Sequence, residues 1–426
     1  MKKLLFNSLL TITVFLFTLT IQAQTWESIE TPVSTNLILH DISFPAGQDL
    51  VGYTGGSNVT YNGKGKILKT EDGGETWDLL WESDVNGTGV TSIYFQSTLI
   101  GFAGTMAGNL MKTIDGGSTW TSTDIDAGQD QGELTDLEFY DENNGALISL
   151  WNGIYITSDG GDTWTEASTN YLGGIDLCYA DATTLFAVGG EQKIYKSTDG
   201  GDTWTFSYQG PNGQMELWYN LGVFFIDADN GIVSSEEGQT FLTDDGGDSW
   251  TLNTIPTQFG LMHGAWMMDI DHIYVCATPG EVFYTEDGGT VWNSEYYDFE
   301  PSYYKIKFTD NGTGFVCGSG ANGGTILRKV PAVVDGIDEL ELTQLSVYPN
   351  PAKDVITLSF EGNTNELYNL TILSSLGKLV YSQEYQSISG KNEIKIDLNE
   401  LAEGNYLISI DKENEHILTN RFQIIR

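Results

Sequence analysis

The chain has 426 residues, with 59 acidic side chains against 19 basic ones and a formal net charge of −40. A surface this negative repels phosphate backbones and anionic lipid headgroups, which argues against binding to nucleic acids or to membrane surfaces. Fifty glycines and 12% aromatic residues are typical of an all-β protein rich in turns.

Residues 1–23 have the layout of a signal peptide. Lys2 and Lys3 precede an apolar run that ends at Ile21, and Ala23 offers a small residue at a plausible cleavage point. The alternative is an uncleaved membrane anchor, but polar residues dilute the run. We therefore expect an exported protein with no membrane insertion after the signal is cleaved.

An eight-residue phrase returns six times along the chain, and its first copy is residues 70–77, Thr-Glu-Asp-Gly-Gly-Glu-Thr-Trp. Its aspartates are Asp72, Asp115, Asp159, Asp199, Asp245 and Asp287, at intervals of 43, 44, 40, 46 and 42 residues. A repeat with this period indicates a ring or array of similar supersecondary units.

We call each copy of this eight-residue phrase a box. Three short strand-like runs, named A, B and C, precede each box, and the box leads into a fourth strand, named D. A seventh A–B–C set follows at residues 305–308, 314–316 and 326–328 without a box, and residues 25–30 read as a D strand without a set before it. The two pieces make one whole unit. The sequence thus predicts an all-β, seven-bladed β-propeller over residues 24–329, closed by the N-terminal strand.

The box has a structural explanation. Its two glycines reach backbone conformations that strain other residues, and its aspartate can accept hydrogen bonds from turn amides. We interpret the six aspartates as structural. The phrase Ser/Thr-x-Asp-Gly-Gly-x-Thr-Trp resembles the Asp-box, or BNR repeat, of sialidase-like propellers, photosystem II assembly factors and some secreted xyloglucan hydrolases. The resemblance implies that the boxes lie away from the active face.

Residues 344–426, after a linker at 330–343, read as short alternating strands, which suggests a small Ig-like β-sandwich. They resemble the type A C-terminal sorting domain of the type IX secretion system of Bacteroidota, through the motifs at 348–351, 401–406 and 422–426. The resemblance implies periplasmic transit, recognition by the secretion machinery and a sortase, and release or attachment at the outer-membrane surface. An ordinary Ig-like binding module is the alternative.

The residues needed for known propeller chemistry are scarce. Sialidases hold a carboxylate with several arginines, and residues 24–329 contain only Arg328. A glycoside hydrolase using two rim carboxylates remains the alternative function. The histidines His40, His263 and His272 are dispersed, so we expect neither a metal site nor a cofactor.

Three cysteines occur, so at least one is unpaired. Cys276 and Cys317 fall at matching places in neighbouring repeats. A disulfide between them is possible, although two buried thiols are favoured.

Aromatic residues outside the box position mark the candidate ligand-binding rim, opposite the boxes. We expect them on connections between strands, where they suit stacking on a sugar or gripping a protein, so we predict a binding or interaction module. The alternative is that they pack between loops. The candidates are the aromatic residues Trp81, Trp151, Trp218, Tyr219, Tyr296 and Tyr297, together with the carboxylate Glu216.

A second group of candidates is acidic. Asp41, Asp136 and Asp176 occupy equivalent places near the start of strand A, with Glu138 two residues further on. We expect them at the mouth of the central channel. They could bind a cation or accept hydrogen bonds from the amides of neighbouring A strands, and the second role is favoured.

Overall fold

The computed structural model forms two compact units, one of residues 22–332 and one that contains residues 333–426. The structure describes residues 25–32, 37–58, 63–125, 132–151, 153–167, 173–211, 219–257, 260–320, 323–331, 346–350, 352–362, 367–374, 379–399, 401, 404–412 and 415–424. The expected signal peptide and most of the expected linker lie outside these residues.

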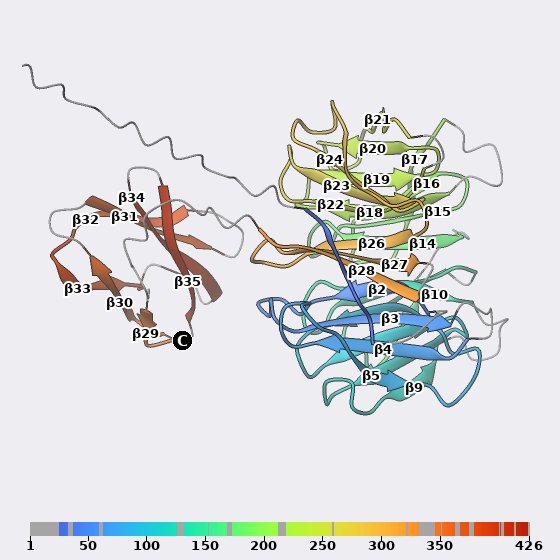
Figure 1. The fold of residues 1–426 in the computed structure, drawn as a ribbon, viewed down its shortest axis with the longest axis horizontal. Coiled ribbons are helices and arrows are strands. Elements are labelled where there is room, and N and C mark those ends of the chain that lie inside the picture. Colours follow the sequence, from blue (N-terminus) through green and yellow to red (C-terminus); the bar gives the residue numbers. More distant parts are fainter. Residues whose placement is uncertain are drawn as a thin grey trace, which may run out of the picture. The chain divides into compact units, whose positions relative to one another are not determined.

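The described part of the larger unit forms seven four-stranded antiparallel sheets (Figure 1). Six of them follow one another along the chain. Their strands are β2 (Leu37–Ser43), β3 (Gly52–Asn58), β4 (Gly65–Thr70) and β5 (Asp78–Glu82); β6 (Val90–Phe95), β7 (Gly101–Thr105), β8 (Asn109–Thr113) and β9 (Thr121–Asp124); β10 (Leu134–Phe139), β11 (Gly145–Ser149), β12 (Gly153–Thr157) and β13 (Thr165–Glu166); β14 (Gly174–Tyr179), β15 (Leu185–Gly189), β16 (Lys193–Ser197) and β17 (Thr205–Gln209); β18 (Asn220–Phe225), β19 (Gly231–Ser235), β20 (Gln239–Thr243) and β21 (Thr251–Thr254); and β22 (Leu261–Met267), β23 (Ile273–Thr278), β24 (Glu281–Thr285) and β25 (Asn293–Tyr297).

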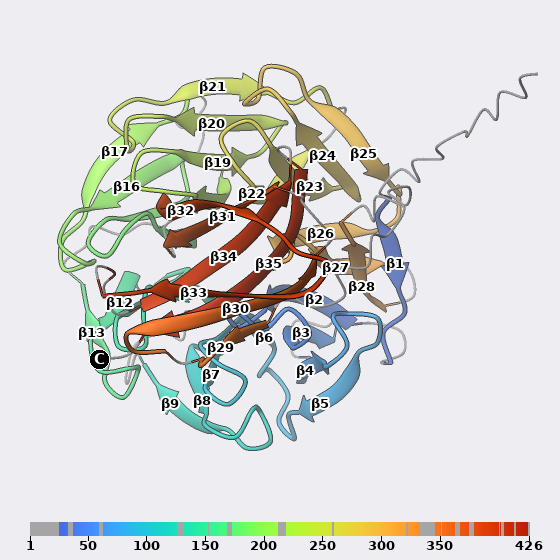
Figure 2. The same ribbon diagram turned by 90° about the vertical axis from the view of Figure 1, so that its left-hand side faces the viewer.

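The remaining sheet joins the two ends of this unit. It consists of β26 (Ser302–Phe308), β27 (Gly314–Gly320), β28 (Gly323–Lys329) and β1 (Glu27–Ile29). β1 pairs antiparallel with β28, so that Ser28 lies opposite Leu327 and Ile29 opposite Ile326. Figure 2 shows the sheets of this unit around a common centre, with β1 and β28 next to β25.

Burial varies systematically across each sheet. The second strands β7, β11, β15 and β19 are buried at every residue, whereas the outer strands β9 and β13 are exposed. The cores therefore lie between neighbouring sheets. Phe186 of β15 stacks on Phe225 of β18 with ring centroids 4.0 Å apart, and the box residue Trp250 packs edge-on against both rings.

Each box closes a turn between the third and fourth strand of its sheet. In the first box, Asp72 accepts the Thr76 amide at 2.9 Å and the Thr76 hydroxyl at 2.6 Å, and Gly73 and Gly74 have φ values of 72° and 81°. The same amide bond recurs at the other five aspartates, from Thr119, Thr163, Thr203, Ser249 and Val291. All six box aspartates are engaged in turn hydrogen bonds.

Each box also docks on the turn between the first two strands of its own sheet. The amide of the first box glycine donates to a carbonyl in that turn, as from Gly73 to Leu50 at 2.9 Å and from Gly246 to Asp229 at 2.8 Å. Several of these turns have their own aspartate cap, such as Asp227, which accepts the amides of Asp229 and Asn230. The repeat thus contains a second, weaker turn motif that the sequence analysis did not identify.

The smaller unit has two antiparallel sheets. One contains β29 (Ser346–Tyr348), β30 (Val355–Gly362) and β33 (Gly390–Asp397), and the other contains β31 (Leu367–Ser374), β32 (Leu379–Gln386), β34 (Gly404–Lys412) and β35 (Glu415–Ile424). Both contribute to one apolar core, with Leu358 and Ile396 from the first sheet and Leu370 and Ile408 from the second. Among the described residues of the whole chain, no helix has the length and apolar character to cross a membrane.

Candidate functional site

The first strand of each sheet in the larger unit carries a register irregularity at the same place. The residues at this bulge are Asp41, Ser92, Asp136, Asp176, Gly222, Gly264 and Lys305, in chain order. The three aspartates are equivalent, as the sequence predicts, but they are buried, at 3%, 5% and 6% exposure. They lie within the strands and not at an exposed channel mouth.

The carboxylates in these strands accept hydrogen bonds from the amides of the next first strand. Asp41 accepts from Ile93 at 2.8 Å, and Asp176 accepts from Val223 at 2.8 Å. Asp136 accepts from Leu177 at 3.2 Å, and Glu138 accepts from Tyr179 at 3.0 Å. These bonds occupy one oxygen of each group and tie neighbouring sheets together.

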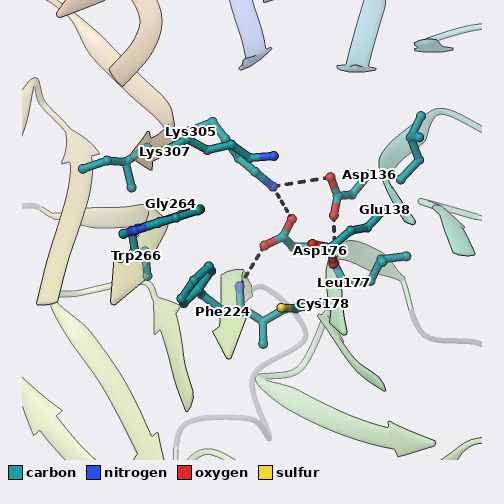
Figure 3. A pocket seen from close by; sticks show the side chains of 14 residues that line it. Asp136, Glu138, Asp176, Leu177, Cys178, Phe224, Gly264, Trp266, Lys305 and Lys307 are labelled. Atoms are coloured by element: carbon teal, nitrogen blue, oxygen red, sulfur yellow. Dashed lines mark hydrogen bonds and ion pairs between the residues drawn. The ribbon is translucent and has the colours of Figure 1, made fainter. Parts of the chain in front are cut away.

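Lys305 of β26 reaches two of these aspartates (Figure 3). Its Nζ lies 2.7 Å from Asp176 Oδ1 and 3.4 Å from Asp136 Oδ1. Burial alone would lower the pKa of Lys305, but Asp136, Asp176 and Asp41 outweigh it and raise that pKa well above its usual value. Burial raises the pKa of Asp136, and Lys305 offsets only part of this effect. The single ammonium group of Lys305 therefore interacts electrostatically with three buried carboxyl groups, those of Asp41, Asp136 and Asp176.

A cavity of about 120 Å³ lies beside this cluster (Figure 3). Glu138, Phe224, Trp266 and Lys307 contribute to its walls. The cavity is smaller than the roughly 300–1,000 Å³ of small-molecule sites. Within the described residues, no group of three or more His, Cys, Asp or Glu side chains is arranged to hold a metal ion. The acidic candidates thus belong to a buried ion-pair network beside a small cavity.

The candidate rim residues do not form one group. Trp151 lies in the turn between β11 and β12 and is 58% exposed. Trp81 and Tyr296 lie on the outer strands β5 and β25, not on connections as expected, and both are half-buried against core residues. Tyr297 ends β25 and is 58% exposed. Tyr219 is half-buried just before β18, and Glu216 and Trp218 lie outside the described residues.

A larger groove lies where β1 meets the connection between β25 and β26. Its volume is about 480 Å³, and we call it the seam groove. Its walls include Glu30, Tyr296, Asp298, Glu300 and Tyr303. The exposed Tyr297 ends β25, and Phe299, which is 71% exposed, lies in the connection that follows.

The seam groove lies on the rim opposite the boxes. In the last sheet, Gly320 pairs with Gly323 beside the groove, whereas Gly314 pairs with Lys329 at the far end, where boxes stand in other sheets. The sequence analysis named Tyr296 and Tyr297 but missed the acidic residues of the seam groove, which are Glu30, Asp298 and Glu300. It also missed Lys305 of the ion-pair network. A comparison of the bulge positions would have placed Lys305 in the aspartate series.

All three cysteines are free and buried, including Cys276 and Cys317. Burial raises the pKa of the Cys276 thiol to about 12. Protonated, inaccessible thiols are structural side chains.

Two families match parts of the chain. Residues 19–175 match the family described as Photosynthesis system II assembly factor YCF48, and residues 346–425 match the Secretion system C-terminal sorting domain. No curated protein matches the chain.

Solved structures similar to this chain are propellers. YCF48 bound to D1 peptide is 21% identical, with a TM-score of 0.57 over 72% of this chain and 97% of that chain. YCF48 from Cyanidioschyzon merolae is 18% identical, with a TM-score of 0.56 over 72% and 99%. The WD40 β-propeller domain of Doa1 is 12% identical, with a TM-score of 0.54 over 72% and 97%. At these identities the likeness establishes the fold alone.

The larger unit is therefore a β-propeller with BNR repeats, similar over residues 19–175 to the YCF48 assembly factors, and residues 346–425 are a type IX secretion sorting domain that indicates export to the cell surface or the medium.

Proposed function

We propose that the protein is an exported binding module whose propeller holds a protein or glycan ligand on the rim opposite the boxes. The observation that carries the proposal is the seam groove, a cleft of ligand size lined by the ring of Tyr296, with the exposed Tyr297 and Phe299 next to its lining residues in the chain. Exposed aromatic side chains on a rigid scaffold are typical of recognition surfaces. A propeller of the same fold has been solved with a bound peptide, which is consistent with this use of the fold.

The proposal includes a closed ring of seven blades. The pairing of β1 with β28 supports it, because it joins the first strand of the unit to the last sheet. The seam groove forms at this junction.

Export depends in this proposal on residues 344–426, an Ig-like domain that a sortase removes at the outer membrane. The match to the sorting domain over residues 346–425 supports this assignment. The mature propeller is then released or remains attached to the cell surface.

We do not propose glycoside hydrolysis at the buried acidic cluster. The buried carboxylates of Asp136 and Asp176 and the half-buried carboxylate of Glu138 are engaged by amides or by Lys305, and the cavity beside them holds about 120 Å³. That space is too small for a sugar between two carboxyl groups with its attacking water.

Binding by the full chain to peptide and glycan arrays tests the proposal. The double variant Tyr297→Ala with Phe299→Ala, at the end of β25 and in the connection that lines the seam groove, should lose at least tenfold in affinity for ligands bound by the native chain. Both side chains are more than half exposed, so stability should change by less than about 0.5 kcal/mol. The matched control, Ile114→Ala with Val291→Ala, removes exposed apolar side chains from two boxes and should bind normally. A native chain that binds neither kind of array contradicts the proposal.

A further inference from the structure

The seam groove has an excess of negative charge. Glu30 follows β1, while Asp298 and Glu300 lie between β25 and β26, and all three side chains are exposed. Within the described residues, none of them forms an ion pair. The nearest basic residue along the chain to the groove's β28 edge, Arg328, is paired with Glu27 and Glu75. The groove therefore presents unneutralised carboxylates.

A buried hydroxyl in the groove wall also lacks a regular hydrogen-bond partner. Tyr303 lines the groove and is 0% exposed, yet its hydroxyl has no hydrogen-bond partner of normal geometry among the described residues; the Tyr296 side chain lies near it and, second to burial, adds to the raised pKa of Tyr303. Leaving a buried polar group unsatisfied costs about 1–3 kcal/mol, so such groups are rare in folded proteins. Burial raises the pKa of Tyr303, so the hydroxyl stays protonated and keeps oxygen lone pairs that a ligand donor can use.

The acidic connection is held in place by its own backbone. The Asp298 amide donates to the Gly280 carbonyl at 2.8 Å, and Asp298 Oδ1 accepts the Glu300 amide at 3.3 Å. On the other wall, the Thr31 hydroxyl donates to the Gly324 carbonyl at 3.1 Å. A cleft fixed in this way loses little entropy when a ligand enters.

The charge of the whole propeller favours the same class of ligand. Residues 24–329 contain 44 acidic residues and 10 basic ones. The negative electrostatic field of these residues attracts cations and raises the rate at which they encounter a negatively charged cleft. It repels acidic peptides and sulfated or uronic-acid glycans.

We infer that the seam groove binds a cationic side chain of a peptide segment, the ammonium of a lysine or the guanidinium of an arginine. Glu30, Asp298 and Glu300 pair with the charge, and the Tyr303 hydroxyl accepts one N–H. The ring of Tyr296 contacts the methylene stem or the cation itself. This inference rests on the proposed binding function and names the ligand class of that site.

Fluorescence anisotropy of labelled tetralysine with the full chain tests the inference. Tetraglutamine and tetraglutamate serve as neutral and acidic probes and should not bind. The triple variant Glu30→Gln, Asp298→Asn and Glu300→Gln should weaken tetralysine binding at least tenfold, because charged hydrogen bonds are the strong ones. Tyr303→Phe should weaken it about threefold or more without lowering the melting temperature, since the hydroxyl has no partner of normal geometry within the described chain.

A matched triple variant controls for the general field of the protein. Asp78→Asn, Glu166→Gln and Glu286→Gln remove the same charge from exposed positions outside the groove and should leave binding within about twofold of native. Equal weakening in both triple variants, or none in the groove variant, overturns the inference. If tetralysine fails to bind while the array ligands still do, the inference falls and the proposed binding function stands.

Discussion

At the scale of single residues, two neutral histidines make the stability of the propeller depend on pH. His40 bonds to the Ser57 hydroxyl at 3.3 Å, and His263 bonds to the Thr278 hydroxyl at 3.1 Å. Burial lowers the pKa of each histidine to about 4. Between pH 6.5 and pH 4 the unfolded chain therefore binds protons that the folded chain does not, and folding becomes less favourable as the pH falls.

We expect the free energy of unfolding to decrease across that window, by up to about 3 kcal/mol per histidine. Urea denaturation at pH 7, 5.5 and 4 measures the decrease. The double variant His40→Gln with His263→Gln should flatten the profile. The box aspartates act at lower pH, because hydrogen bonds from Thr163 lower the pKa of Asp159 to about 2 and its contribution is lost only as the pH falls from about 4 to 2. A double variant that still loses stability as steeply above pH 4 would contradict this assignment.

At the scale of secondary structure elements, the bulge of β26 puts a lysine where β10 and β14 put aspartates. Lys305 neutralises Asp176 and part of the charge of Asp136, across strands that belong to different sheets. A buried ion pair contributes little compared with an apolar replacement, but loss of one partner leaves an uncompensated charge. The network is therefore most vulnerable at its single cation.

We expect Lys305→Met to lower the free energy of unfolding by about 3–5 kcal/mol at pH 7. The loss should shrink at pH 5, because the raised pKa of Asp136 allows protonation to remove one buried charge. Adding Asp136→Asn and Asp176→Asn to the variant should recover most of the stability, since an amide oxygen can still accept the backbone N–H. Chemical denaturation of the three proteins checks this, and an equal loss with and without the asparagines would rule out the charge explanation.

At the scale of the whole molecule, the proposed ring depends on the strand that precedes the repeats. Trp26, just before β1, is 4% exposed, donates to Glu295 at 2.9 Å and packs edge-on against Tyr274 and Phe308. These contacts join the sheet of β26, β27, β28 and β1 to the neighbouring sheet of β22, β23, β24 and β25. The other chain-wide feature is the sorting domain, which is compact on its own.

Trp26→Ala should lower the free energy of unfolding by about 3–5 kcal/mol, because it removes a buried indole and leaves a cavity. Trp151→Ala, at a 58% exposed position, should change it by less than about 0.5 kcal/mol. Thermal denaturation distinguishes the two. A mild effect of Trp26→Ala would show that β1 contributes little to the integrity of the propeller.

Deletion of residues 344–426 should retain the propeller in the periplasm. Cell fractionation and surface proteolysis measure its location, with the full-length Tyr297→Ala variant as a control that should be exported normally. Surface display of the truncated chain would contradict the role given to the sorting domain.

The repeat in the sequence was enough to predict the all-β fold, the four strands around each box and the turn chemistry of residues such as Asp72. Local spacing carries that information. The contacts of Lys305 and the seam groove depend on residues about 130 to 290 positions apart, as in the pair Lys305–Asp176 and the approach of Thr31 to Gly324. The sequence analysis placed Trp81 on a connection because the sequence does not define where a strand begins and ends. Trp81 in fact lies inside β5, and its ring packs against core residues.

The direction of two strands has a practical consequence. β1 runs from Glu27, opposite Arg328, towards the seam groove, and β28 runs away from the groove to Lys329. The polypeptide thus enters and leaves the propeller at the rim that carries the boxes. Immobilising the protein on a biosensor chip through either of these two connections would leave the acidic cleft open to the analyte, and a fluorescent reporter fused there would not obstruct it.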